Sequence, residues 1–368
     1  MQKLFQGSNC IQSARDSLHA IGCRNTMIVA GNSFFNGPLK QEFDTFFPKS
    51  VFFREFHPNP LYEEVCAGVE MFRSCGCDSI MAVGGGSALD VAKCIKLFCR
   101  MTQGENYLLQ EFCDNGVPLV VLPTTAGTGS EATRFAVIYK DGEKQSVAHD
   151  SIIPDMVILK PSVLKTLPLY QKKCTMLDAI CQGIESWWSV NSTPESRAFS
   201  KEAVSRIMTH WKEYLHDGSA TAAEQIMLAA NTAGKAINIT QTTAPHAMSY
   251  KLTSMYKIPH GHAVALCLPE VWEHMMKHSD ECIDPRGKEF LKQILQDISD
   301  AVSKENNIGQ AAGFRSFLKQ LDIDFPAVVR EGDTEILASS VNPVRLKNNP
   351  VKLSREVLLQ MYKNITSQ

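Results

Sequence analysis

The stretch V-G-G-G-S-A-L-D-V-A-K, residues 83–93, decides the fold class. The apolar run before it, residues 80–83, has the length of a buried strand, and the glycines lead into a stretch of helical character. Three consecutive glycines remove every Cβ atom from the turn, so a bulky anion can approach the backbone where the free N–H groups of the helix attract phosphate. The spacing is neither the Rossmann fingerprint nor a P-loop. The stretch therefore predicts either a pyrophosphate-binding turn or a tight strand-to-helix connection.

A second loop of small residues, P-T-T-A-G-T-G-S-E at 123–131, also follows a predicted strand, residues 119–122. Its threonines place hydroxyl groups beside open backbone. In open α/β sheets, ligands bind at the carboxyl ends of the strands. Two such loops together therefore predict a ligand site more strongly than either loop alone.

The chain divides into two regions of different periodicity. Short β-rich runs alternate with helical stretches in the first region, as in a parallel sheet built from βαβ units. We predict strands at 26–30, 51–56, 80–83 and 119–122, a helix at 61–73, and a hairpin of 135–139 with 145–148 around Asp141-Gly142. We predict helices at 172–190, 194–214, 220–239 and 263–277, and a last helix that begins at Ser354. These patterns predict an α/β domain over residues 1–162 and an all-helical domain over residues 163–368.

Composition excludes two classes of partner. Lys and Arg number 37 against 39 Asp and Glu, a net charge of -2, so the chain lacks the positive excess that nucleic-acid binding needs. Its apolar runs are far shorter than the roughly 20 residues of a membrane span. Residues 1–7 are not followed by the apolar stretch of a signal peptide. We therefore expect a cytoplasmic protein without nucleic-acid or membrane partners, whose 12 cysteines stay reduced.

Several side chains of the second region have the chemistry of metal ligands. Asp178 and Gln182 lie four residues apart on a predicted helix and share a face, and His246 and His260 follow later in the chain. Oxygen and imidazole ligands suit a divalent transition metal. Solvated helix-face pairs and structurally satisfied histidines would give the same pattern. The neighbouring His262 can be a ligand, a proton relay or a hydrogen-bonded neighbour.

Taken together, these stretches resemble the iron-containing alcohol dehydrogenase family. The resemblance is carried by residues 83–93 and 123–131, by L-D-A-I-C-Q-G-I-E-S at 177–186, by A-P-H-A-M-S-Y and I-P-H-G-H-A within 244–263, and by N-N-P at 348–350. Their order and spacing match over nearly the whole chain. The resemblance implies an N-terminal α/β domain that binds NADPH or NADH, a helical domain that holds one divalent metal ion, Fe²⁺ or Zn²⁺, and an active site in the cleft between the domains. It also allows a homodimer.

The resemblance assigns roles to individual residues. It places the dinucleotide on Gly31, Asn32, Gly84, Gly85, Gly86, Ser87, Asp90, Thr124, Thr125, Thr128 and Lys144. It places the metal ion on Asp178, Gln182, His246 and His260. The reaction implied is reversible hydride transfer between the nicotinamide and an aldehyde carbon, and Tyr250, His262 or a bound water are the candidates for the proton donor.

Three positions depart from the family pattern. Gln182 stands where the family usually has a histidine, and an amide is a weaker ligand than imidazole, so the metal is held more loosely, is not iron, or has been lost. Tyr250 stands where many relatives have another histidine. Gly31-Asn32-Ser33 lacks the acidic residue that usually accompanies NAD preference, so NADPH should be tolerated.

The motifs are most similar to those of the phosphonoacetaldehyde reductase branch, which makes 2-hydroxyethylphosphonate. A phosphonate needs cations or clustered donors, and Arg134, Lys251 and Ser189 lie in motifs that would supply them. Ordinary ion pairs would explain the two cations equally well. Three alternatives stay open: a general short-chain alcohol dehydrogenase, a dehydroquinate synthase-like cyclase, and a non-catalytic nucleotide- or metal-binding relative.

Overall fold

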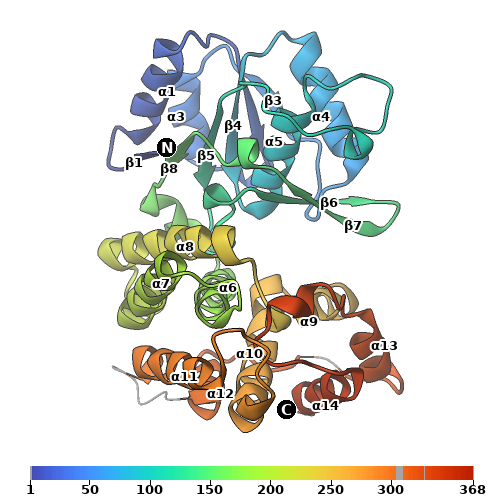
Figure 1. Cartoon of the computed structure of the whole chain (residues 1–368). Coiled ribbons are helices and arrows are strands. Elements are labelled where there is room, and N and C mark those ends of the chain that lie inside the picture. The colour runs from blue at the N-terminus through green and yellow to red at the C-terminus, as the bar shows by residue number, and fades with distance from the viewer. Residues whose placement is uncertain (1, 304–309, 327, 368) are drawn as a thin grey trace. The chain divides into compact units, whose positions relative to one another are not determined.

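The computed structural model describes residues 2–303, 310–326 and 328–367. The chain divides into two compact units, Met1–Lys165 and Thr166–Gln368 (Figure 1). The first unit is an α/β domain and the second is built from helices. The predicted fold class is therefore confirmed.

The first unit is a parallel sheet with helices on both faces. Its strands are β1 (Lys3–Phe5), β2 (Thr26–Ala30), β3 (Val51–Phe53), β4 (Ser79–Gly84), β5 (Leu119–Pro123), β6 (Phe135–Lys140), β7 (Glu143–Ala148) and β8 (Met156–Ile158). Its helices are α1 (Cys10–Ala20), α2 (Asn32–Phe35), α3 (Leu39–Phe46), α4 (Tyr62–Ser74) and α5 (Gly86–Phe98). Six strands form the sheet, in the order β1-β8-β5-β4-β2-β3, and all of its pairings are parallel. The predicted strands are present, although β3 ends at Phe53 and is three residues shorter than expected.

The predicted hairpin is also present, outside the main sheet. Strands β6 and β7 pair antiparallel and form a separate two-stranded sheet. Asp141 and Gly142 connect them with φ values of 53° and 77°. Two consecutive residues with positive φ are the requirement of a two-residue hairpin turn whose twist matches the strands.

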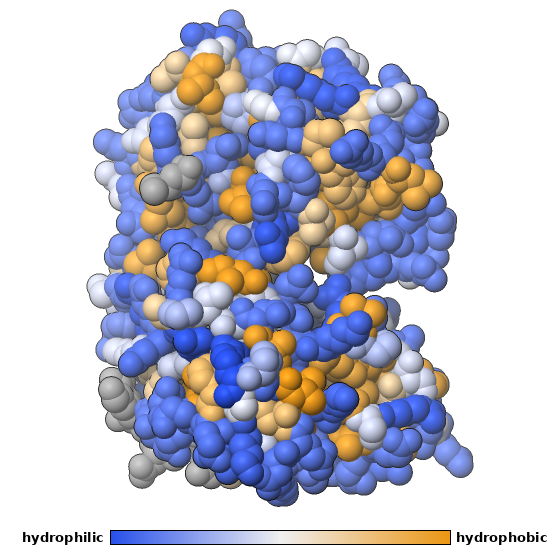
Figure 2. All heavy atoms as spheres, viewed as in Figure 1, coloured by the Kyte–Doolittle hydropathy of each residue, from blue (hydrophilic) through white to orange (hydrophobic). Residues whose placement is uncertain are grey.

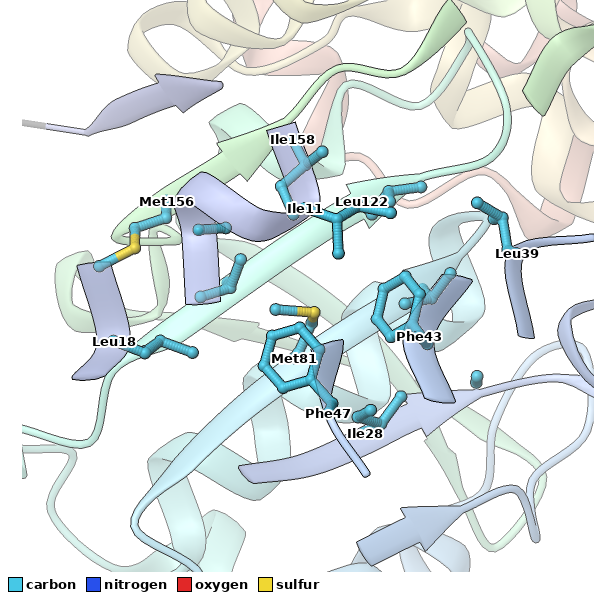
Figure 3. Close-up of a cluster of buried hydrophobic side chains, with 14 of the residues drawn as sticks. Ile11, Leu18, Ile28, Leu39, Phe43, Phe47, Met81, Leu122, Met156 and Ile158 are labelled. Carbon is cyan, nitrogen blue, oxygen red and sulfur yellow. The ribbon is translucent and has the colours of Figure 1, made fainter. Parts of the chain in front are cut away.

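The core of the first unit follows the alternation of side chains along each strand (Figure 3). Ile28 on β2, Met81 on β4 and Leu122 on β5 point to the face covered by α1 and α3, where they pack in one buried cluster. Their neighbours along each strand, such as Val29 and Ala82, are fully buried as well. A sheet buried on both faces explains why these strands appear in the sequence as continuous apolar runs.

The second unit consists of helices joined by short connections. They are α6 (Leu169–Trp188), α7 (Pro194–Lys212), α8 (Ala220–Thr240), α9 (Ala244–Tyr256), α10 (His260–Lys277), α11 (Lys288–Ser303), α12 (Gln310–Gln320), α13 (Asp333–Ser340) and α14 (Arg355–Thr366). The predicted start of α10 at residue 263 is wrong, because the helix begins at His260, directly after the N-cap Pro259. His260 is therefore the first helical residue rather than part of a loop.

On the face shown in Figure 2, hydrophilic residues predominate, and several groups of hydrophobic residues lie between them. Within the described residues, no helix has the length and apolar character that a membrane crossing requires.

Candidate functional site

The glycine turn joins β4 to α5 and leaves the beginning of the helix open. Gly85 is the N-cap residue, and no side chain caps the helix. Gly85, Gly86 and Ser87 are partly exposed. The first N–H groups of α5 therefore face outward together with the positive end of the helix dipole, which is the arrangement that binds phosphate.

The second loop lies directly beside the glycine turn. Thr124 N donates a hydrogen bond to Gly84 O at 2.9 Å. A Cβ atom at Gly86 would lie 3.1 Å from Thr128 Cγ2, whereas one at Gly85 would lie 3.6 Å from Thr125. A side chain at Gly86 would thus press against Thr128, which would have to move slightly. At Gly85 the protein itself leaves room for a side chain, so the missing side chain there leaves space for a ligand.

A buried hydrogen-bond network around Lys93 and Asp90 holds the second loop in place. Lys93 is fully buried, and its Nζ donates to Phe135 O at 2.8 Å and to Ser130 Oγ at 3.0 Å. Asp90 accepts hydrogen bonds from Ser130 Oγ at 3.0 Å and from Val137 N at 3.1 Å. Both carboxylate oxygens of Asp90 are therefore engaged with the protein. These contacts favour a role for Asp90 in holding the loop, where the sequence predicted direct contact with the dinucleotide.

The remaining predicted dinucleotide contacts surround this region. Gly31 follows β2 as the N-cap of α2, and Asn32 is exposed at the first helical position. Strand β2 pairs with β4, and the order of the sheet reverses between them, which is where open α/β sheets bind ligands. Burial raises the pKa of Asp90, and the charge of Lys144 on β7 partly opposes this effect. Lys144 therefore lies near the same network.

Three predicted metal ligands converge in the second unit, from α6, α9 and α10. Asp178, His246 and His260 each offer one ligand atom, and these atoms lie within 4.8 Å of one another. His246 Nε2 lies 3.3 Å from Asp178 Oδ1, and the two imidazole centroids are 5.2 Å apart. Within the described residues, no other group of three or more His, Cys, Asp or Glu side chains meets this criterion.

Glu185 orients His246. It is fully buried, and one carboxylate oxygen accepts a hydrogen bond from His246 Nδ1. The other oxygen accepts from Thr243 N at 2.7 Å and from Thr243 Oγ1 at 2.9 Å. Trp188 Nε1 donates to that hydroxyl oxygen at 2.9 Å, so the hydroxyl proton is directed toward Glu185. Nδ1 of His246 therefore carries a proton, and Nε2 is the nitrogen left for a metal ion.

Ser249 has the same effect on His260. Its hydroxyl donates to His246 O at 2.8 Å and lies 3.3 Å from His260 Nδ1. A serine hydroxyl has a single proton, which is already donated, so it accepts the proton of Nδ1. Nε2 of His260 then carries the lone pair that a metal ion would need. The two imidazoles thus reach the same tautomer through different partners.

The donor set fits a divalent transition metal. Asp178 Oδ1 and His246 Nε2 are buried and make no hydrogen bond within the described residues, although they face each other. Burial disfavours charge on His246, but Glu185 and Asp178 outweigh it and raise the pKa of the imidazole to about 9. Burial also opposes ionisation of Asp178, yet the two histidines outweigh it and lower the pKa of the carboxyl. One carboxylate and two oriented imidazoles form a ligand set typical of Zn²⁺ and Fe²⁺.

Gln182 lies one helical turn after Asp178 and is 3% exposed. A hydrogen bond from its side chain contributes to the low pKa of Asp178. The amide is therefore beside the three ligands. Its role as a fourth ligand stays a prediction.

Tyr250, the first predicted proton donor, lies against this group. Its ring stacks on that of His260 with a centroid distance of 5.5 Å and an interplanar angle of 4°. Arg345 Nη1 donates a hydrogen bond to the phenol oxygen at 3.4 Å. Because a guanidinium only donates, the phenol oxygen accepts this hydrogen bond and the phenol keeps its own proton.

His262, the second predicted proton donor, is held by protein partners on both ring nitrogens. Nδ1 lies 2.8 Å from the Tyr170 hydroxyl, and Nε2 lies 2.8 Å from Asp324 O. Because a carbonyl only accepts, Nε2 donates and Nδ1 accepts. Burial lowers the pKa of His262, so the imidazole stays neutral. These contacts favour a structural role for His262 and leave Tyr250 as the stronger candidate.

The three residues predicted to bind a substrate anion have different environments. Arg134 belongs to the first unit and forms an ion pair with Asp150 at 3.2 Å. Ser189 is buried in the second unit, where its hydroxyl accepts a hydrogen bond from Asn191 N at 3.2 Å. Lys251 follows Tyr250 on α9. Its neighbour Tyr250 stacks on the imidazole of His260.

Sequence reasoning missed Glu185, Ser249 and Arg345. A signal for Glu185 was present, because residues 178, 182 and 185 follow the i, i+4, i+7 spacing of one helix face. Ser249 lies three residues after His246 on α9, but its contact with His260 on α10 has no local signal in the sequence, and neither has the contact of Arg345 with Tyr250.

Replacing Glu185 with glutamine is expected to weaken metal affinity about 10- to 100-fold. The amide keeps the size of the carboxylate, but its NH₂ group must face either the donors of Thr243 or Nδ1 of His246. The first orientation opposes donor to donor, and the second draws the proton of His246 to Nε2. Titration of the metal-free protein with Zn²⁺ against a chromophoric chelator measures the affinity.

The matched control is Glu202→Gln, which removes a partly exposed carboxylate paired with Arg206 on α7. Its Zn²⁺ affinity should equal that of the unchanged protein. Thermal unfolding of both metal-free variants separates loss of affinity from loss of folding. If folded Glu185→Gln binds Zn²⁺ as tightly as the unchanged protein, Glu185 does not position His246 for metal binding.

Two family models match most of the chain. Residues 2–161 match the family described as iron-containing alcohol dehydrogenase, and residues 173–366 match the C-terminal domain of the Fe-containing alcohol dehydrogenase family. The chain is 30% identical to phosphonoacetaldehyde reductase from Streptomyces viridochromogenes, over 80% of this chain and 78% of the relative. It is 27% identical to NAD-dependent methanol dehydrogenase from Bacillus methanolicus, over 97% and 96% of the two chains.

A solved structure shows the same fold. Sulfoacetaldehyde reductase from Bifidobacterium kashiwanohense, in complex with NAD⁺, superposes with a TM-score of 0.88 at 24% identity. The match covers 100% of this chain and 97% of that chain. The likeness extends over both units.

Proposed function

The chain belongs to the iron-containing alcohol dehydrogenase family, and on this basis we propose that it reduces phosphonoacetaldehyde to 2-hydroxyethylphosphonate with NADPH or NADH. The aldehyde carbon gains a hydride and its oxygen gains a proton. When bound, the nicotinamide supplies the hydride and the metal ion polarises the carbonyl group. The observation that carries the proposal is the buried group of Asp178, His246 and His260 with oriented imidazoles.

The residues of the chain prepare the reaction in three ways. The open N-terminus of α5 binds the pyrophosphate of the dinucleotide. Glu185 and Ser249 hold the imidazoles in the tautomer that leaves Nε2 for the metal ion. Tyr250 donates the proton to the substrate oxygen, since its phenol oxygen already accepts a hydrogen bond from Arg345.

The phosphonate part of the proposal is supported by similarity and by charge. A relative that is 30% identical over 80% of this chain is a phosphonoacetaldehyde reductase. A phosphonate dianion requires positive partners. Two cations, Lys251 and Arg345, adjoin Tyr250, one in sequence and one in space.

NADPH is an accepted cofactor in this proposal. The segment after β2, Gly31-Asn32-Ser33, contains no carboxylate that would repel a 2′-phosphate. We therefore expect NADPH to be oxidised at least as efficiently as NADH.

The test is a comparison of two aldehydes with the metal-loaded enzyme. Protein reconstituted with Fe²⁺, Zn²⁺ or Mn²⁺ is mixed with NADPH, and the nicotinamide absorbance is followed. We expect kcat/KM for phosphonoacetaldehyde to exceed that for acetaldehyde about 100-fold, the equivalent of ~2.7 kcal/mol from charge-assisted hydrogen bonds.

Other results would indicate a different function. Equal kcat/KM values for the two aldehydes would indicate a general short-chain alcohol dehydrogenase. Absence of NADPH oxidation with every metal and aldehyde would leave a non-catalytic relative or a cyclase that releases no oxidised cofactor.

A further inference from the structure

Arg345 stands on a short turn that is tied to the metal-ligand helices of the second unit. The 3-10 turn η7 (Arg345–Asn348) begins with it. Asn348 Nδ2 donates to Thr242 O at 3.2 Å, just before α9, and Asn348 O accepts from Val190 N at 3.1 Å, just after α6. The turn is therefore anchored to the ends of the two helices that carry Asp178 and His246.

One aromatic ring separates Arg345 from a metal ligand. The guanidinium carbon lies 5.3 Å from the centroid of the Tyr250 ring, and Nη1 donates to the phenol oxygen at 3.4 Å. The same ring stacks on His260. Tyr250 thus fixes the position of the positive charge relative to His260, because it contacts both.

We propose that Arg345 binds the anionic group of the substrate, a tetrahedral phosphonate or sulfonate. This inference rests on the proposed aldehyde reduction. In phosphonoacetaldehyde only one methylene group separates the aldehyde carbon from phosphorus. A substrate whose carbonyl lies beside His260 and Tyr250 must therefore place its anion on the wall of the same site.

Arg345 suits this task by its chemistry and by its position. It has five N–H donors in a planar fork that matches two oxygens of a tetrahedral anion, and the bond to Tyr250 engages one of them. Arg134 forms an ion pair with Asp150 in the first unit. Arg286 is paired with Asp284 and also donates to backbone oxygens. Arg345, by contrast, contacts Tyr250, which stacks on His260.

The experiment measures a ratio of substrates in charge-removing variants. Arg345→Gln, Arg345→Lys and Arg134→Gln are compared with Lys347→Gln, which removes an exposed cation from the same turn. The kcat/KM values are measured for phosphonoacetaldehyde, sulfoacetaldehyde and acetaldehyde. Calorimetry with phosphonoacetate, an unreactive anion, measures binding to the metal-loaded enzyme in the presence of NADP⁺.

We expect Arg345→Gln to lower the ratio of phosphonoacetaldehyde to acetaldehyde kcat/KM by about 10- to 100-fold, mainly through KM, and to weaken phosphonoacetate binding similarly. Arg345→Lys should recover part of the loss, because it keeps the charge without the fork. Lys347→Gln should leave the ratio unchanged. A parallel loss for sulfoacetaldehyde would identify the shared tetrahedral anion as the recognised group, and a loss confined to one aldehyde would identify that one.

Two results would overturn the inference. One is an equal loss for anionic and neutral aldehydes in Arg345→Gln, which would indicate an effect through Tyr250 alone. The other is a change of ratio in Arg134→Gln instead. Failure of the proposed function is recognised separately, in the unchanged enzyme, as absence of turnover or of any preference for the anionic aldehyde.

Discussion

Replacing His260 with alanine is expected to lower kcat/KM for aldehyde reduction by about 1,000-fold, equivalent to ~4 kcal/mol of transition-state stabilisation. The change removes one of three converging ligands and also the ring on which Tyr250 stacks. Bound metal, measured by elemental analysis, should fall with the activity. The affinity for NADPH, measured by nicotinamide fluorescence, should stay within about twofold, because the glycine turn belongs to the other unit.

The control for this prediction is His278→Ala. His278 is an exposed histidine that follows the last residue of the same helix, α10. It should leave both metal content and turnover unchanged. Full activity with retained metal in His260→Ala would exclude His260 from the metal-ligand group.

Replacing Gly85 with valine is expected to weaken NADPH binding and to leave the bound metal unchanged. The dissociation constant for NADPH should rise about 100-fold, equivalent to ~2.7 kcal/mol. Gly85 has φ -79° and ψ -169°, values that any residue adopts, so the backbone is not strained. Its Cβ position lies 3.6 Å from Thr125, an ordinary contact. The added methyl groups therefore act mainly by filling the space in front of the first N–H groups of α5, where the pyrophosphate binds.

Gly85→Ala provides the graded comparison, since it adds only the Cβ atom, and its effect on NADPH affinity should be smaller. Metal content should equal that of the unchanged protein in both variants. An unaltered NADPH dissociation constant in folded Gly85→Val would remove the glycine turn from the dinucleotide site. We expect His260→Ala to retain NADPH binding and Gly85→Val to retain the metal ion. If both variants nevertheless lose turnover, the reaction requires the metal ion and NADPH together.

Much of the fold could be predicted because its signals are local. The strands at 26–30 and 119–122 are continuous apolar runs, and Asp141-Gly142 has the residue types of a hairpin turn. Strands β1 and β8 were not predicted. Each has three residues, and each is stabilised by pairing with the other across about 150 positions of the chain, a partner that no local pattern reveals.

The sequence by itself predicted the candidate metal ligands and the open glycine turn, because the family motifs contain these residues. Only the tertiary structure decided which nitrogen of each histidine carries the proton, through Glu185 and Ser249, and that Arg345 lies over Tyr250. It also showed that both nitrogens of His262 are engaged. Tautomers and ring stacking depend on atoms from separate helices meeting within hydrogen-bonding or van der Waals distance, and that information exists only once the chain has folded.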